Sequence, residues 1–167
     1  AIAKGLDEQQ LLDQLIKINE INDRIKSGDF FVEENRPKSN RDRNNYLKEA
    51  GTKNLKDNRN KDDKKFRILA GAEVNILKDG SLDISNNVLD RLDIIGAAIH
   101  SNFSLTEEIQ TERLIRAAQN PSVDIIFHPT GRIINKREGY PVNISKLLFT
   151  AMETNTVLEI DEHYNRL

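Results

Sequence analysis

The 167-residue sequence contains no cysteine. Disulfide bonds and thiolate metal sites are therefore excluded, and any bound metal must be held by histidine, aspartate, glutamate or backbone oxygen atoms. Ligands of these types favour zinc, manganese, magnesium or iron over a structural zinc knuckle. The composition is thus compatible with a catalytic kind of metal site and incompatible with the sulfur-based kinds.

Long apolar runs and an excess of charge of one sign are also missing. No apolar run approaches the roughly 18 residues that a membrane-spanning helix needs, and no signal peptide is recognisable. The formal net charge is −2, which gives no general argument for binding nucleic acid or a membrane surface. We expect a soluble cytoplasmic protein without membrane contacts. The start of the chain, Ala1–Lys4, lacks an initiator methionine, so we also expect a piece of a longer protein.

The first regular element that the sequence predicts is a helix over Leu6–Lys26. Asp7 followed by Gln10 matches a capping box, and Ser27-Gly28 is a suitable end for the helix. Apolar residues at spacings of three and four share one face of it: Leu11, Leu15, Ile18, Ile21 and Ile25. A chain of this length can form one domain with a sizeable core.

Residues 27–65 differ in kind from the rest of the chain. They carry eleven Lys or Arg, eight Asp or Glu and seven Asn, for a local net charge of +3. Such a stretch buries too little apolar surface to offset the entropy of ordering it. We expect a polar surface insertion, partly mobile, with a short helix near Arg43–Ala50. It is either a basic arm that contacts nucleic acid or a solvated loop, and its mixed charges favour the loop.

From Phe66 onward, strand and helix patterns alternate. Four mostly apolar runs predict strands: Phe66–Ile76, Asp93–Ile99, Val123–Phe127 and Thr156–Ile160. Helical segments with recognisable caps lie between them: Ser85–Leu92, Thr106–Ala118 and Asn143–Asn155. In the last helix, four apolar residues are expected to face inward: Leu147, Leu148, Ala151 and Met152. The alternation predicts an α/β fold with a parallel sheet built from βαβ units.

Three of the predicted strands end in a residue that can bind a metal. Glu73, His100 and His128 lie at these ends, and the carboxyl ends of parallel strands face one side, where ligands and catalytic groups collect. Each residue alone also suits a surface, capping or salt-bridge role, but three on three strand ends favour a common site. Two imidazoles and a carboxylate are ligands of a catalytic zinc or manganese site, whose natural chemistry is hydrolysis.

Two further residues leave alternatives open. Arg132, in the loop after His128, is either a clamp for a phosphate group or a solvated arginine, and its spacing does not decide between them. His163 is either a fourth metal ligand or part of a surface loop, and its place among polar residues near the chain end favours the loop. The sequence identifies no catalytic acid, base or nucleophile.

Several motifs resemble the polymerase and histidinol phosphatase (PHP) domain. The segment Ile68–Asp83, ILAGAEVNILKDGSLD, is similar to the family's KGIEVDIL-DGSLD, and Ala97–Ser101, AAIHS, is similar to its ASVHS. Asn120–Arg132, NPSVDIIFHPTGR, resembles NP-VDILGHPTGR, and Thr156–Ile160 resembles the TALEIN strand. The HPTGR form is typical of the PHP domain of bacterial and archaeal family X DNA polymerases.

The resemblance covers residues 1–26 and 66–167. It implies a distorted (βα)7 TIM-like barrel with parallel strands and a centre of up to three divalent metal ions, Mn or Zn, at their carboxyl ends. The implied activity is phosphoester hydrolysis, such as 3′-5′ exonuclease action or 3′-end processing of DNA. By position, Glu73 is then a metal-bridging carboxylate, His100 and His128 are metal ligands, and Arg132 lies near bound phosphates.

The chain also departs from the family pattern. The family's first two metal motifs and its final Asp-x-His pair have no counterpart here, so we expect a partial barrel with exposed sheet edges that is inactive by itself. Phe127 replaces the family's glycine before the histidine and is expected to crowd the strand end. His163 stands where the family has asparagine, so no ligand role is carried onto it. We expect residues 1–167 to form a single partial domain with 27–65 as an insertion.

These observations lead to three hypotheses of function. The first is a fragment of a metal-dependent phosphoesterase domain from a family X DNA repair polymerase, which meets DNA through the parent protein. The second is a non-catalytic PHP-like module that contacts polymerase or DNA through residues 27–65. The third is a separate phosphatase related to histidinol phosphate hydrolysis, which the HPTGR motif favours less. The exposed sheet edges also predict self-association or a partner that covers them.

Overall fold

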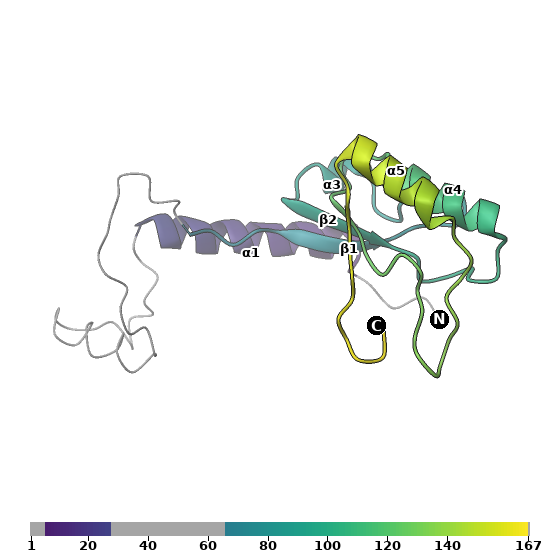
Figure 1. The fold of residues 1–167 in the computed structure, drawn as a ribbon. Coiled ribbons are helices and arrows are strands. Elements are labelled where there is room, and N and C mark those ends of the chain that lie inside the picture. The colour runs from purple at the N-terminus through teal and green to yellow at the C-terminus, as the bar shows by residue number, and fades with distance from the viewer. Residues whose placement is uncertain (1–5, 28–65, 167) are drawn as a thin grey trace. The chain divides into compact units, whose positions relative to one another are not determined.

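The structure is a computed structural model that describes residues 6–27 and 66–166 (Figure 1). The predictions made for the polar stretch 27–65, apart from Ser27, lie outside the described residues. The chain divides into two compact units, one formed by Ala1–Ile16 with Leu69–Leu167 and the other by Lys17–Ile68. The first of these units contains the sheet and the predicted site residues.

Helix α1 spans Glu8–Ser27, close to the prediction. The capping box is confirmed: the Gln10 backbone N–H donates to Asp7 Oδ1 at 2.8 Å, and the Asp7 N–H donates to Gln10 Oε1 at 2.9 Å. Of the predicted apolar face, Leu11 and Leu15 are buried as expected, Ile18 and Ile25 are half-buried, and Ile21 is exposed. The two hydrogen bonds of the capping box satisfy backbone N–H groups that the start of a helix otherwise leaves unpaired.

Four parallel strands form one sheet in the order β1-β2-β3-β4, which confirms the predicted parallel α/β arrangement. The strands are β1 Gly71–Asn75, β2 Ile94–Ala98, β3 Ile125–Ile126 and β4 Val157–Leu158. Each is shorter than the apolar run that predicted it. The sheet does not show a closed barrel, and the TIM-like barrel stays a prediction.

Three helices connect the strands. They are α3 Asn86–Leu89, α4 Glu107–Ala118 and α5 Ile144–Thr154. Helix α3 ends three residues before the predicted Leu92, whereas α4 and α5 begin after the predicted caps Thr106 and Asn143. Helices α4 and α5 lie side by side (Figure 1). Helix α4 packs against β3, and α5 packs against β4. Among the described helices, none has both the length and the apolar character needed to cross a bilayer.

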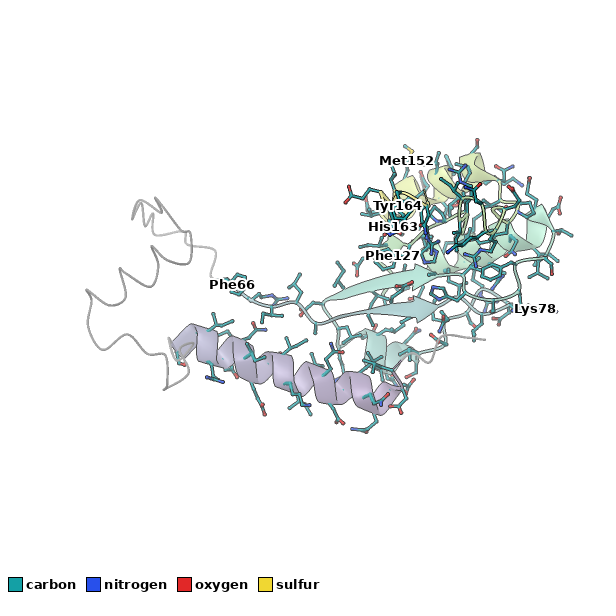
Figure 2. The ribbon with its side chains drawn as sticks, turned by 90° about the horizontal axis from the view of Figure 1, so that it is seen from below. Phe66, Lys78, Phe127, Met152, His163 and Tyr164 are labelled. Atoms are coloured by element: carbon teal, nitrogen blue, oxygen red, sulfur yellow. The ribbon has the colours of Figure 1, made fainter. Side chains whose placement is uncertain are left out.

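The prediction for the inner face of α5 is half right. Leu147 and Ala151 are buried, but Leu148 is 49% exposed and Met152 is 77% exposed. Figure 2 shows Met152 on the side of α5 that faces away from the strands. Neighbouring residues of a helix point in directions about 100° apart. Leu147 and Ala151, four residues apart, therefore face the core together, whereas Leu148 and Met152 are turned away from it.

The register of the strands separates two faces of the sheet. Val74, Ala97 and Ile126 are aligned across the strands and belong to the buried core, together with Leu114 of α4 and Leu147 of α5. Because side chains alternate along a strand, Glu73, Gly96 and Ile125 point to the other face. Helices α4 and α5 therefore cover one face, and the predicted ligand Glu73 stands on the opposite one.

Phe127, which we expected to crowd the strand end, lies against Gly96, and the absence of a Cβ atom at that position leaves space for its ring. A Cβ atom added to Gly96 would lie far inside contact distance of Cε2 of Phe127. Glycine is thus required at position 96 by close packing against the phenylalanine. The Phe127 ring therefore packs on β2, one residue before the predicted ligand His128.

Candidate metal centre

Glu73, His100 and His128 converge, although they come from three separate segments of the chain. Glu73 Oε1 lies 3.1 Å from His100 Nε2 and 3.2 Å from His128 Nε2. One ligand atom from each residue lies within 4.8 Å of the other two, which is close enough for all three to hold one metal ion. The expected meeting of the three side chains is therefore found, while their role as ligands stays a prediction.

Glu73 reaches the site from a different place than predicted. It is the third residue of β1 rather than a strand-end residue, because the ladder continues through the pairs Val74↔Ala97 and Asn75↔Ala98. Its long side chain spans the remaining distance to the two histidines. The Glu73 side chain is 45% exposed, whereas those of His100 and His128 are 32% and 14% exposed. The site is accordingly open on the Glu73 side.

His100 follows β2 and is held at its other ring nitrogen. Its Nδ1 atom lies 2.7 Å from Oδ1 of Asn75. Burial lowers the pKa of His100 from its ordinary value of 6.5, the charge of Glu73 opposes that change, and the nearby cations Arg137 and Arg166 add to it. The neutral imidazole is thereby favoured, and this is the form that binds metal ions.

His128 occupies a backbone conformation that few residues adopt. Its φ angle is +32°, in the region where a side chain other than that of glycine is strained. The backbone N–H of His128 donates to Glu159 Oε2 at 2.7 Å, which holds the residue just beyond β3. Its Nδ1 atom is buried and has no hydrogen-bond partner within the described part of the chain. Strain of this kind is frequent at functional sites.

The donor set fits a divalent cation. If the neutral His100 ring carries its proton on Nδ1 and donates a hydrogen bond to Asn75 Oδ1, the lone pair of its Nε2 faces Glu73 Oε1 at 3.1 Å. Two electron-rich atoms at this separation repel each other unless a cation lies near both of them. The imidazole rings of His100 and His128 are 5.2 Å apart, so the second histidine can reach the same cation. One carboxylate and two imidazoles match the ligand types of zinc and manganese sites.

The two residues left open by the sequence lie in different surroundings. His163 belongs to a local turn, where its Nδ1 lies 2.6 Å from Asn165 Oδ1 and its ring lies 4.5 Å from that of Tyr164. It is not part of the converging group. Arg132 is exposed and lines a pocket of about 270 Å³ that His128 and Arg166 also line. The structure therefore places Arg132, and not His163, next to the candidate centre.

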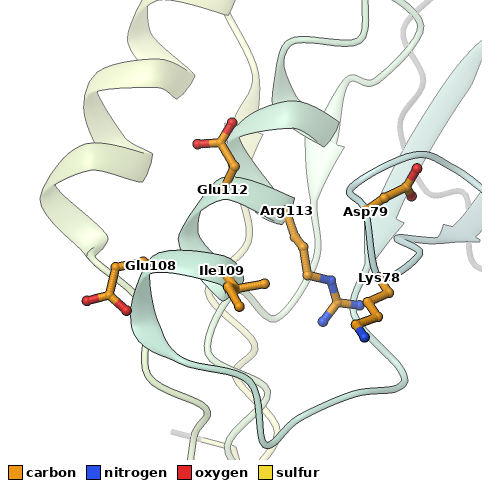
Figure 3. Close-up of a pocket in the computed structure, with 6 residues that line it drawn as sticks. All are labelled: Lys78, Asp79, Glu108, Ile109, Glu112 and Arg113. Atoms are coloured by element: carbon orange, nitrogen blue, oxygen red, sulfur yellow. The ribbon is translucent and has the colours of Figure 1, made fainter.

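A larger pocket of about 430 Å³ lies between α4 and the turn after β1 (Figure 3). Figure 3 shows Arg113 reaching from α4 toward the segment that carries Lys78 and Asp79. The Arg113 guanidinium is fully engaged: it donates to backbone oxygens after β1 and β2 and to Gln110 Oε1 at 2.7 Å. Arg113 is 1% exposed and serves to join these two loops.

Sequence reasoning missed four residues that shape the centre. They are Asn75, Asp83, Arg113 and Glu159. A signal for Asn75 was present, because it lies two residues after Glu73 on a strand and so shares its face. A signal for Arg113 was its spacing of three from Gln110 on the buried side of α4. Asp83 and Glu159 lie in the matched segments Ile68–Asp83 and Thr156–Ile160, but no spacing or alternation pairs either residue with the centre.

The fold and the site together define an α/β protein with a candidate metal centre near the carboxyl ends of parallel strands. No family model matches the chain. It is 48% identical over 102 residues to the DNA polymerase/3′-5′ exonuclease PolX of Bacillus subtilis strain 168, which is 61% of this chain and 18% of that protein. It is 40% identical over 98 residues to a probable phosphatase of Thermoanaerobacter sp. strain X514, which is 56% of this chain and 38% of that protein.

Other relatives have the same kind of name. A probable phosphatase of Acetivibrio thermocellus is 35% identical over 100 residues, which is 58% of this chain and 39% of that protein. The chain thus spans less than two fifths of the length of each of these relatives. The matches are consistent with the PHP resemblance of the sequence motifs, and they connect the chain with a family X polymerase and with phosphatases.

Proposed function

We propose that this chain is part of a metal-dependent phosphoesterase domain of the PHP type, within a family X DNA polymerase that removes or processes nucleotides at 3′ ends. The observation that carries the proposal is the convergence of Glu73 Oε1 with Nε2 of His100 and His128. The likeness to the Bacillus subtilis polymerase and exonuclease supports the choice of DNA as the substrate. The chain meets DNA as part of that longer protein.

Glu73, His100 and His128 would hold a divalent metal, manganese or zinc. When bound, such a metal lowers the pKa of a coordinated water molecule and polarises a phosphoryl oxygen. The carboxylate supplies negative charge for the cation, and burial of His100 keeps its ring neutral for binding. Further ligands, up to those of a three-metal centre, belong to parts of the family pattern that this sequence does not match.

Arg132 would bind the phosphate group of the substrate. Its guanidinium is exposed, and it lines the pocket that adjoins His128. A guanidinium can donate two parallel hydrogen bonds to a pair of phosphate oxygens. In this position it would hold a phosphoester next to the candidate metal centre. Arg166 lines the same pocket, but its Nε atom is paired with Asp161 Oδ2 at 3.3 Å.

The test of this proposal uses the whole protein encoded by the reading frame that contains the chain. It would be incubated with Mn²⁺ and a single-stranded oligonucleotide labelled at its 5′ end. We expect stepwise shortening from the 3′ end that requires the metal and is lost in His128→Ala. Asp79→Asn is the matched control, because Asp79 stabilises the turn after β1 through Ser81 and does not contact the three ligands.

The phosphatase names of several relatives favour a second candidate substrate, a small phosphomonoester. The same proteins would therefore be assayed with p-nitrophenyl phosphate. Hydrolysis of this compound without shortening of the oligonucleotide would replace the exonuclease proposal with a phosphatase. Metal-dependent activity that is equal in the wild type and in His128→Ala would contradict both candidates.

A further inference from the structure

Asp83 and Asn75 are joined by three hydrogen bonds. The Asp83 backbone N–H donates to the Asn75 carbonyl oxygen at 3.1 Å, and the Asn75 N–H donates to Asp83 Oδ1 at 2.8 Å. The third bond runs from Asn75 Nδ2 to Asp83 Oδ2. An antiparallel bridge between Ile76 and Leu82 closes the same turn. The Asp83 carboxylate is therefore held at a fixed place beside the Asn75 amide.

This arrangement determines which way the Asn75 amide points. A carboxylate only accepts hydrogen bonds, so the NH₂ group of Asn75 must face Asp83. The amide oxygen is then the atom that faces His100 Nδ1, at 2.7 Å. Because an amide oxygen cannot donate, the proton on the neutral His100 ring must be on Nδ1. Asp83 thus fixes the orientation of the Asn75 amide, and the Asn75 amide fixes which nitrogen of the His100 ring carries the proton.

We propose that Asp83 and Asn75 are positioning residues that keep His100 in the Nδ1–H tautomer, with the lone pair of Nε2 directed at the metal position. This inference rests on the proposed function, since it assigns a partner to one ligand of the same site. Partners of this kind fix the orientation of a metal-binding histidine and raise its basicity. Asp83 ends the matched segment Ile68–Asp83, but no local pattern pairs it with Asn75, which is eight residues away.

Glu73 competes with this arrangement. It would favour a proton on His100 Nε2, from which its Oε1 is 3.1 Å away. That tautomer would place the Nδ1 lone pair against the Asn75 oxygen at the shorter distance of 2.7 Å. The Glu73 side chain is 45% exposed and can turn toward solvent, whereas Asp83 prevents the Asn75 amide from turning. The contact with Asn75 therefore decides the tautomer.

His128 provides an internal comparison. Its Nδ1 atom is buried and has no partner within the described residues, while its Nε2 lies 3.2 Å from Glu73 Oε1. The neutral His128 ring can satisfy Glu73 by donating from Nε2. The two histidines are consequently expected to carry their protons on different nitrogens in the metal-free chain. A measurement that shows which ring nitrogen is protonated therefore distinguishes His100 from His128.

The experiment is ¹⁵N NMR of the histidine rings of the metal-free chain at about pH 8.5, where free imidazole is neutral. The chain has three histidines, and the His100 signals are assigned by their loss in His100→Gln. In the wild type we expect a protonated Nδ1 and an unprotonated Nε2 for His100. A wild-type spectrum with the His100 proton on Nε2 would overturn the inference without the use of any positioning variant.

Asp83→Asn tests the direction of the effect. The side-chain oxygen of the introduced asparagine would still accept the backbone N–H of Asn75, so its NH₂ group would face the Asn75 side chain and force that amide to turn over. The NH₂ group of Asn75 would then face His100 and move the ring proton to Nε2. We expect this shift together with a loss of Zn²⁺ affinity of roughly 10- to 100-fold, the usual effect of losing such a partner.

The exchange of the two side chains supplies a rescue. In the double variant Asn75→Asp with Asp83→Asn, the carboxylate at position 75 accepts from both His100 Nδ1 and the new amide, so the wild-type tautomer and affinity should return. Asp79→Asn, in the same turn, should change neither. If Asp83→Asn keeps the wild-type tautomer, the inference is wrong even when metal binding is confirmed. If the wild type binds no Zn²⁺, the proposed function fails, and the tautomer still decides the inference.

Discussion

Tyr140 is a buried residue whose hydroxyl group is in an unusual environment. It is 5% exposed, and its ring stacks on Phe103 with the ring centres 6.0 Å apart. Its hydroxyl is buried without a hydrogen-bond partner in the part of the chain that the structure describes. Burial raises the pKa of Tyr140 well above its ordinary value of 10.0. The folded state therefore favours the neutral phenol.

This environment predicts how stability depends on alkaline pH. Because the pKa of Tyr140 is higher in the folded state than in the unfolded state, its contribution is complete below about pH 10 and declines as the pH rises further. Tyr140→Phe should remove this decline and should leave stability at neutral pH unchanged or raise it by about 1 kcal/mol. Urea unfolding at neutral and alkaline pH measures both effects. An equally steep alkaline decline in Tyr140→Phe would contradict the prediction.

At the scale of single residues, the sequence predicted the meeting of Glu73, His100 and His128 but not what holds them in place. The reason is that the order of the strands brings these three positions together. The residues that hydrogen-bond the candidate ligands are placed by the conformation of the turns instead. Asn75 was within reach of prediction, since it alternates with Glu73 on one face. Asp83 depends on the exact path of the turn at Asp79-Gly80, where Gly80 has a φ of +84°.

At the scale of elements, the packing of β2 against β3 depends on Gly96 and Phe127. A Cβ atom at position 96 would overlap the Phe127 ring. Gly96→Ala should therefore lower the free energy of unfolding by about 1–3 kcal/mol through overpacking. In a Phe127→Ala background the same substitution should cost much less, because the ring is gone. Chemical denaturation of the two single variants and the double variant measures this coupling.

The double-variant comparison separates packing from backbone effects. If Gly96→Ala costs the same with and without the Phe127 ring, the contact between the two residues does not explain the glycine. The coupling free energy that we expect exceeds about 0.5 kcal/mol, as is usual for residues in direct contact. Ala97→Gly on the same strand is the matched control, since Ala97 points to the other face of the sheet.

The apolar runs predicted which elements exist better than they predicted their lengths. Val123 is buried as expected, yet β3 contains only Ile125–Ile126. Apolar composition reports burial, whereas a strand also requires a neighbour that runs alongside with its hydrogen bonds in register. The caps Thr106 and Asn143 were predicted closely because they act locally, each accepting a hydrogen bond from a backbone N–H three residues ahead. Ser85 stands at the N-cap of α3 but makes no side-chain capping hydrogen bond.

At the scale of the whole molecule, self-association through sheet edges stays a prediction. β1 and β4 are the outer strands of the described sheet, and Val157 of β4 is 57% exposed. An open strand edge offers unpaired backbone groups to a second chain. We expect the sedimentation coefficient to rise with protein concentration and to rise less in Val157→Lys, because a charged edge opposes pairing. A constant monomer value for the wild type would contradict the prediction.

The function proposed for the whole molecule rests on alignments with longer proteins. They cover 61% of the chain against the polymerase and 56% against the Thermoanaerobacter phosphatase. The sequence motifs identified the same class of relatives because they lie in the strand ends and turns that surround the candidate centre. The TIM-like barrel and the three-metal centre stay predictions from the resemblance.

The most direct test of the central claim is calorimetric titration of Zn²⁺ and of Mn²⁺ into the metal-free chain. Wild type, Glu73→Gln and Glu153→Gln would be compared, the last being an exposed residue of α5 that is not one of the three converging residues. We predict saturable binding to the wild type and to Glu153→Gln, and binding weaker by roughly 100-fold or more in Glu73→Gln, beyond the usual loss for an outer partner. Equal affinity in all three proteins, or no binding to the wild type, would contradict the account.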